Sequence, residues 1–155
     1  MKDYIYLAGP MEDKTHVEMS QWRRMAQDLL RLSDIEVLNP TRRISFHDQL
    51  QGREPSEPDK EILQEGIKTL NVCRRIFKQD LQDIAKSKVV IADVRRKSGR
   101  GTGTSMELMF AHMKNKIIIL WSDPEDFVHP FYEAIFTEKH TELSEAVFAA
   151  KEYYE

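Results

Sequence analysis

The chain has 155 residues, of which 41% are hydrophobic, and it carries a single cysteine, Cys73. This composition suits one folded domain spanning residues 1–155, and it excludes a disordered chain and a framework of internal disulfides. The 23 Lys and Arg residues against 26 Asp and Glu residues give a net charge of −3, which argues against a nucleic acid polymer or an anionic membrane as the main partner.

Four short apolar runs predict strands that are covered on both faces, as in a parallel sheet. They span residues 4–8, 35–38, 89–92 and 117–121, and a weaker fifth candidate spans 134–137. Apolar residues at helical spacing appear between these runs and after the last of them. They are Trp22, Met25, Ala26 and Leu29, the apolar residues of the long stretch 61–86, then Met106, Met109, Phe110 and Met113, and finally Leu143, Val147 and Ala150. A capping box, Thr15 to Glu18, precedes the first helix, and residues 45–60 are expected to form an exposed loop.

The alternation of strands and helices predicts an α/β sandwich, with a mostly parallel sheet and helices on both faces. Ligands of such folds bind at the carboxyl ends of the strands. The loops after the first four strands are therefore the places where functional residues are expected.

The first two of these loops offer backbone and cationic contacts. Gly9 and Pro10 force a sharp exit from the first strand, followed by Met11, which is either an ordinary turn or a close backbone approach to a ligand. Arg42 and Arg43 follow the second strand, where they either hold a phosphate, a carboxylate or a base edge, or remain solvated.

The third loop, which begins at Asp93, is the most informative stretch of the chain. Gly103, Thr104 and Ser105 lie at the predicted entrance of a helix, where free backbone N–H groups and hydroxyls can hold a polar ligand. The spacing is not that of a phosphate-binding P-loop, and Met106 replaces the third glycine of the dinucleotide fingerprint.

Two carboxylates near this loop have competing interpretations. Glu107 is expected in the first turn of the helix, where it either completes a capping box with Thr104 or points into the pocket. Asp80 lies beside the apolar stripe of the preceding helix, and it is either a surface charge or a group that faces Glu107 across the pocket. Asp83, on the same helix, is expected to point more toward water.

Four short motifs, in order, resemble the nucleoside 2-deoxyribosyltransferase family, whose relatives include nucleoside 5′-monophosphate N-glycosidases. They are Tyr-Leu-Ala-Gly-Pro-Met at 6–11, Val-Leu-Asn-Pro at 37–40, Gln-Asp-Leu at 79–81 and Gly-Thr-Ser-Met-Glu-Leu at 103–108. The resemblance implies a flavodoxin-like three-layer sandwich with a parallel five-stranded sheet. It also implies no cofactor, and a homo-oligomer in which a partner subunit completes the site.

The resemblance assigns roles to individual residues. Glu107 would attack C1′ of the sugar and form a covalent glycosyl intermediate, as in a retaining glycosidase. Asp80 would exchange the proton with the nucleobase, and Tyr6 would hydrogen-bond Glu107. The substrate contacts would come from a larger set, in which we count Gly9, Pro10, Met11, Arg43, Asp93, Gly103, Thr104, Ser105 and, from the partner segment 129–132, His129.

One departure from the family concerns the 5′ end of the substrate. Deoxyribosyltransferases commonly carry an acidic residue six positions before the nucleophile, and this chain has Gly101 there, beside Arg100. The change suits a 5′-phosphate better than a free hydroxyl, or else the basic residues of a longer loop simply point into solvent.

Three functions follow from these observations. The first is transfer of a (deoxy)ribosyl group between nucleobases, the second is hydrolysis of a nucleoside 5′-monophosphate, and the third is a non-catalytic nucleotide-binding domain, which would not need Glu107.

Other classes of site find no support in the sequence, because the histidines lack metal-ligand spacing and no serine-hydrolase elbow is present. A structural role is expected for Cys73. The single thiol and the short apolar runs lead us to expect a cytoplasmic protein.

Overall fold

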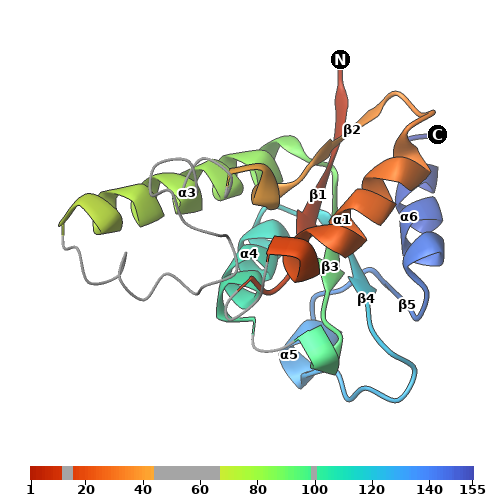
Figure 1. Cartoon of the computed structure of the whole chain (residues 1–155). Helices are drawn as coiled ribbons and strands as arrows, with labels where there is room; N and C mark the ends of the chain where they lie inside the picture. The colour runs from red at the N-terminus through yellow and green to blue at the C-terminus, as the bar shows by residue number, and fades with distance from the viewer. Residues whose placement is uncertain (12–15, 44–66, 99–100) are drawn as a thin grey trace.

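The computed structural model describes residues 1–11, 16–43, 67–98 and 101–155. Strands and helices alternate along these segments (Figure 1), and their order is β1 (Asp3–Ala8), α1 (His16–Leu30), β2 (Ile35–Leu38), η1 (Pro40–Arg43), α3 (Ile67–Lys86), β3 (Val89–Asp93), η3 (Arg96–Ser98), α4 (Thr102–Met113), β4 (Ile117–Trp121), α5 (Pro130–Glu133), β5 (Glu138–His140) and α6 (Leu143–Glu152). The expected loop at 45–60, the capping residue Thr15 and the start of the long helical stretch at 61–66 lie outside the described residues.

The five strands form one sheet in the order β2-β1-β3-β4-β5, and every neighbouring pair is parallel. Tyr6 of β1 lies opposite Leu38 of β2 and Val90 of β3. This strand order is that of the flavodoxin-like fold, in which ligands bind where the order reverses, here between β1 and β3. The predicted fold class is therefore confirmed.

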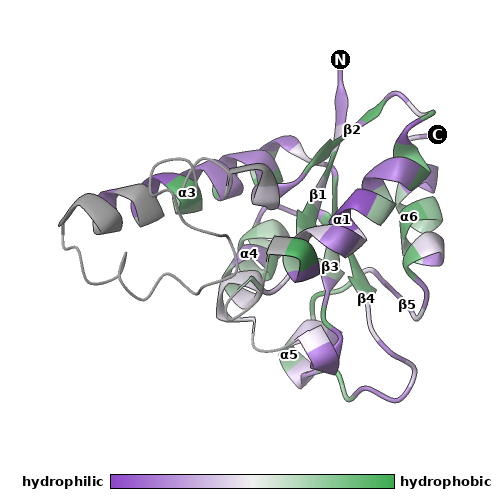
Figure 2. Cartoon of the chain, viewed as in Figure 1, coloured by the Kyte–Doolittle hydropathy of each residue, from purple (hydrophilic) through white to green (hydrophobic). Residues whose placement is uncertain are grey.

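Alternate residues of the strands pack on opposite sides of the sheet, because successive side chains of a strand point to opposite faces. Ile5 and Leu7 belong to the core beneath α1 and α6, whereas Tyr6 and Ala8 belong to the core beneath α3 and α4. Figure 2 shows green on the inner stretches of the strands, whereas α1 and α3 carry much purple along their length. Two apolar layers thus hold the sandwich together.

One predicted strand was placed wrongly. Residues 134–137 are not a strand; they follow the short helix α5, and β5 begins after them at Glu138. Pro130 occupies the first turn of α5 and favours helical φ there, and the carbonyl of Tyr132 accepts the N–H groups of Ile135 and Phe136. The apolar side chains of 135–136 pack under the sheet from this turn rather than from a strand.

All the parallel strands end at one edge of the sheet, and α5 lies at this edge in Figure 1, far from both chain termini. The loops after β1 and β3 and the start of α4 meet here. A search over the described residues finds no helix with the length and apolar character needed to cross a bilayer.

Candidate active site

Tyr6 and Glu107 meet on the sheet face that α3 and α4 cover. Tyr6 is completely buried, and its hydroxyl donates a 2.9 Å hydrogen bond to Oε1 of Glu107. The strand alternation turns Tyr6 toward this face, since its neighbours Ile5 and Leu7 pack on the other. The hydrogen bond leaves Oε2 as the oxygen of Glu107 that is available for chemistry.

The helix that carries Glu107 begins earlier than the sequence predicts. The carbonyl of Gly101 accepts the N–H of Ser105 at 2.8 Å, so Gly101 is the N-cap of α4 and Glu107 lies in its second turn. The capping box between Thr104 and Glu107 is therefore wrong. Instead, Thr104, Glu107, Leu108 and Ala111 form the buried stripe of α4, and this stripe turns the carboxylate toward the sheet.

Asp80 approaches the same pair from α3. It is buried, and its charge acts on both Tyr6 and Glu107. Asp83, which was expected to point more toward water, is buried as well, with 4% of its surface exposed. The reason is that Asp80, Asp83 and Ile84 lie on the buried stripe of α3. The partly buried Ile76, four positions before Asp80, continues this stripe.

The surroundings of Glu107 favour its protonated form. Burial, and then the negative charge of Asp80, raise its pKa to about 8, while the hydrogen bond from Tyr6 and the charge of Arg23 act in the opposite direction. Burial, together with the Glu107 charge, also raises the pKa of Tyr6, which keeps the phenol a hydrogen-bond donor. The raised pKa places the titration of Glu107 close to neutral pH.

Gly9 and Pro10 are buried after β1, and Met11 is half-buried. A Cβ at Gly9 would lie 2.9 Å from Cζ2 of Trp22 and 3.1 Å from Nη2 of Arg23. The need for glycine here therefore comes from two protein side chains on α1. Neither sequence interpretation, an ordinary turn or a close approach to a ligand, included this packing.

The start of α4 presents small and polar groups. Gly103 has open space where a Cβ would be, and Ser105 is exposed. Thr104 is 4% exposed, and its Oγ1 is a buried polar atom without a hydrogen-bond partner in the described structure. An unpartnered buried hydroxyl costs free energy, so this oxygen is suited to a group that binds beside it.

Asp93 and the basic loop after β3 are engaged with one another. The Asp93 carboxylate accepts hydrogen bonds from Nε and Nη2 of Arg95, each at 2.9 Å, and one from the hydroxyl of Ser98 at 2.7 Å. The Arg95 guanidinium also stacks on the ring of Trp121 at 3.5 Å. Asp93 thus anchors this loop, and Arg95 is neither solvated nor available as a free cation.

Three arginine side chains that are candidates for substrate contact fall outside what the structure describes. Pro40–Arg43 forms the 3-10 turn η1 after β2, but the side chains of Arg42 and Arg43 are not described. Arg100 also lies outside the described residues. Their contact with substrate stays a prediction.

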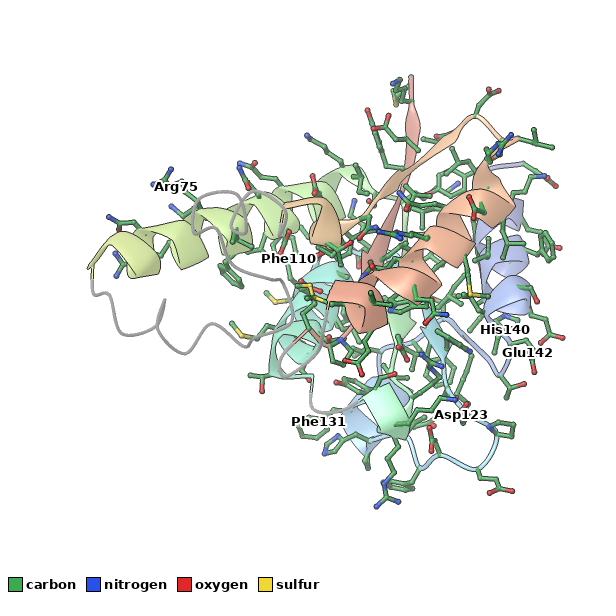
Figure 3. The ribbon with its side chains drawn as sticks, in the orientation of Figure 1. Arg75, Phe110, Asp123, Phe131, His140 and Glu142 are labelled. Atoms are coloured by element: carbon green, nitrogen blue, oxygen red, sulfur yellow. The ribbon has the colours of Figure 1, made fainter. Side chains whose placement is uncertain are left out.

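His129 lies at the start of α5 and lines a cavity there. It caps α5, where its Nδ1 accepts the N–H of Phe131, and Phe131 is exposed on the outer side of α5 (Figure 3). The hydroxyls of Tyr132 and Ser105 lie 2.6 Å apart and join α5 to α4. A cavity of about 450 Å³ is lined by Ser105, Met109, His129, Phe131, Tyr132, Ala134 and Ile135.

This cavity does not include Tyr6, Asp80 or Glu107. Ser105 and Met109 lie two positions on either side of Glu107, which places them on the opposite side of α4. The cavity and the carboxylates therefore occupy different sides of one helix. We place the candidate active site on the carboxylate side of α4, because that side holds the titratable groups whose pKa values are shifted.

Arg23 is the residue of this region that the sequence analysis missed. It is fully buried and lies on α1 beside Trp22, with its guanidinium 4.7 Å from the centre of that ring. A signal was available, because Met19, Trp22, Arg23, Ala26 and Leu30 follow one apolar helical stripe. Within the part of the chain that the structure describes, no group of three metal-ligating side chains comes together.

The fold is shared with two enzymes of known structure. The 2-deoxyribosyltransferase of Bacillus psychrosaccharolyticus superposes with a TM-score of 0.63 at 18% identity, over 93% of this chain and 90% of the enzyme. The CMP N-glycosidase BcmB of Clostridium botulinum superposes with a TM-score of 0.54 at 13% identity, over 96% and 99% of the two chains. No protein-family model matches the sequence, and a sequence comparison with curated proteins finds no match.

Proposed function

We propose that this protein cleaves the N-glycosidic bond of a nucleoside or nucleotide and transfers the sugar to another nucleobase. The observation that carries this proposal is the buried contact between Tyr6 and Glu107, on which the charge of Asp80 also acts. A carboxylate held by one donor and a second carboxyl beside it are the groups that a retaining glycosyl transfer requires. The fold shared with a 2-deoxyribosyltransferase supports the choice of substrate class.

In the first step, Oε2 of Glu107 forms a bond to C1′ of the sugar while the bond from C1′ to the base nitrogen breaks. The electron pair of that bond leaves with the base, and Asp80 supplies the proton that neutralises it. Tyr6 holds Oε1 and fixes the carboxylate in line for attack. The product of this step is a glycosyl ester of Glu107 and a free base.

In the second step, a nitrogen of an incoming nucleobase attacks C1′, and the bond to Glu107 breaks. The incoming base loses its proton to Asp80, which restores the starting state of both carboxyl groups. The reaction consumes one nucleoside and one base and produces another of each. It needs no metal and no redox cofactor, since each step moves only a sugar and a proton.

Hydrolysis of a nucleoside 5′-monophosphate is the second candidate. The N-terminal end of α4 favours it: Gly101 caps the helix without a side chain, and the hydroxyl of Thr104 is unpartnered. Such a helix end suits an anion. The fold shared with a CMP N-glycosidase agrees with this candidate, in which water would replace the second base.

The test is incubation of the protein with a deoxynucleoside and a second free base, with products separated by chromatography, and a parallel series with 5′-monophosphates. Exchanged nucleoside supports transfer, whereas free base and sugar phosphate from monophosphates alone support hydrolysis. Mass spectrometry of the quenched protein should find one sugar on Glu107. Glu145→Gln on the exposed side of α6 is the matched control for Glu107→Gln. No turnover in either series would contradict both candidates and favour a binding domain.

A further inference from the structure

Arg23 places a positive charge inside the protein at the end of β1. Its side chain is 0% exposed. The guanidinium donates hydrogen bonds to three carbonyls, those of Leu7 at 3.5 Å, Gly9 at 3.0 Å and Met19. Leu7 and Gly9 lie on either side of the point where β1 ends, so a single side chain ties the strand end to α1.

This arrangement is costly if its only purpose is packing. A buried guanidinium loses its hydration, and carbonyl oxygens compensate less than a carboxylate does. The ion pairs found between described residues do not include Arg23. Burial accordingly lowers the pKa of Arg23 to about 10, which still leaves it charged at neutral pH.

The charge of Arg23 also acts on the groups of the candidate site. It interacts electrostatically with Tyr6, Glu107, Asp93 and Asp80, and each of these interactions favours the charged guanidinium. Reciprocally, Arg23 favours the ionised form of Glu107. The carbonyl of Gly9 accepts one of the hydrogen bonds from Arg23, and the missing Cβ of Gly9 leaves room for the same guanidinium.

We propose that Arg23 is a positioning residue for Glu107: it fixes the loop after β1 and supplies a positive charge that favours the ionised form of the Glu107 nucleophile. The inference rests on the proposed function. Among the described residues, the groups that act on Glu107 are Tyr6 from β1, Asp80 from α3 and Arg23 from α1. Arg23 is the cation of this set. Its charge lowers the pKa of Glu107, whereas burial and the charge of Asp80 raise it.

The test compares Arg23→Met and Arg23→Lys with the wild type, and Arg24→Met, at the exposed neighbouring position, is the matched control. The first readout is a carbon-13 NMR titration of the Glu107 carboxyl, whose signal is identified by its loss in Glu107→Gln. We expect the titration midpoint to rise in Arg23→Met and to stay close to the wild-type value in Arg23→Lys and Arg24→Met. Circular dichroism establishes that each variant is folded, and Arg23→Gln replaces Arg23→Met if the latter does not fold.

The second readout is the pH profile of kcat and KM on the nucleoside that the wild type turns over. We expect Arg23→Met to lower kcat at neutral pH about tenfold, because each unit of increase in pKa reduces the ionised fraction about tenfold, with a smaller change in KM. A folded Arg23→Met variant with the wild-type midpoint would overturn the proposal, as would a midpoint in Arg23→Lys that rises as far as in Arg23→Met. The titration needs no substrate, so it decides the role of Arg23 even if the proposed function fails.

Discussion

The hydroxyl of Tyr6 lies 2.9 Å from Oε1 of Glu107, although 101 positions separate the two residues in the chain. The contact joins β1, which lies between β2 and β3 in the sheet, to the helix that follows the third strand. It is buried, so water does not compete for it.

Replacing Tyr6 by phenylalanine removes the donor and keeps the ring. We expect kcat to fall about tenfold, the equivalent of one hydrogen bond to a charged group. The acidic limb of the pH profile should also move to higher pH, because the Tyr6 hydroxyl lowers the pKa of Glu107. Tyr4→Phe, two residues earlier on the same face of β1, is the control, and steady-state kinetics over pH is the measurement. Equal losses in both variants would contradict a specific role for Tyr6.

Glu107→Gln should change how stability depends on pH. The folded-state pKa of Glu107, about 8, lies above its ordinary value of 4.5. Between these values the unfolded chain releases the proton and the native protein keeps it, so the free energy of unfolding of the wild type falls as pH rises, by up to about 1.4 kcal/mol per unit.

The variant lacks this proton, so its stability relative to the wild type should increase from about pH 5 to about pH 8 and then level off. Urea unfolding at several pH values is the measurement. In Asp80→Asn the neighbouring negative charge is lost, and the decline of stability should end at a lower pH than in the wild type. Parallel curves for Glu107→Gln and the wild type would show that Glu107 is not protonated in the native state.

Gly9→Ala and Gly103→Ala should have opposite effects on stability. The added methyl at Gly9 meets Trp22 at 2.9 Å and Arg23 at 3.1 Å, so we expect a loss of about 1 to 3 kcal/mol. At Gly103, inside α4, a methyl meets no atom within 4 Å, and alanine should add about 0.5 to 1 kcal/mol. Thermal unfolding measures both. An unchanged unfolding temperature for Gly9→Ala would mean that the loop after β1 shifts at little cost to accommodate the methyl group.

Asp93→Asn should destabilise the protein by about 3 kcal/mol, because it leaves Arg95 without its buried partner. The side chains of Asp93 and Arg95 are 3% and 16% exposed. Asp123→Asn breaks the pair with Lys97, whose side chains are 35% and 64% exposed, and should cost less than about 1 kcal/mol. Similar unfolding temperatures for the two variants would argue against the anchoring role of Asp93 and leave its predicted contact with substrate as the alternative.

A homo-oligomer, which the resemblance implies, stays a prediction that light scattering can test. Met106, Met109 and Phe131 are 52%, 50% and 77% exposed, and Met109 and Phe131 line the cavity between α4 and α5. If copies of the chain associate there, Met109→Glu should dissociate them. Leu32→Glu, at an exposed position after α1, should leave the mass unchanged. A single-chain mass for the wild type would contradict the prediction.

The sequence by itself determined the sandwich, because buried parallel strands leave uninterrupted apolar runs such as 89–92 and 117–121. It also placed Glu107 and Asp80 on neighbouring helices, since their motifs lie at fixed distances from those strands. Local sequence patterns gave wrong predictions where one segment suited two different local structures equally well. The turn at 134–137 is as apolar as a strand, and the spacing from Thr104 to Glu107 is that of a capping box, although α4 starts at Thr102.

Only the tertiary structure decided which charges lie inside. Asp83 lies on an amphipathic helix whose local pattern did not reveal its burial, and the apolar stripe around Arg23 did not reveal which groups its charge would meet. The reason is that burial and electrostatic interaction depend on distances between segments far apart in the chain. Tyr6 comes from β1, Asp80 from α3 and Glu107 from α4, and the Arg23 charge acts on all three only because the sheet brings these elements to one edge.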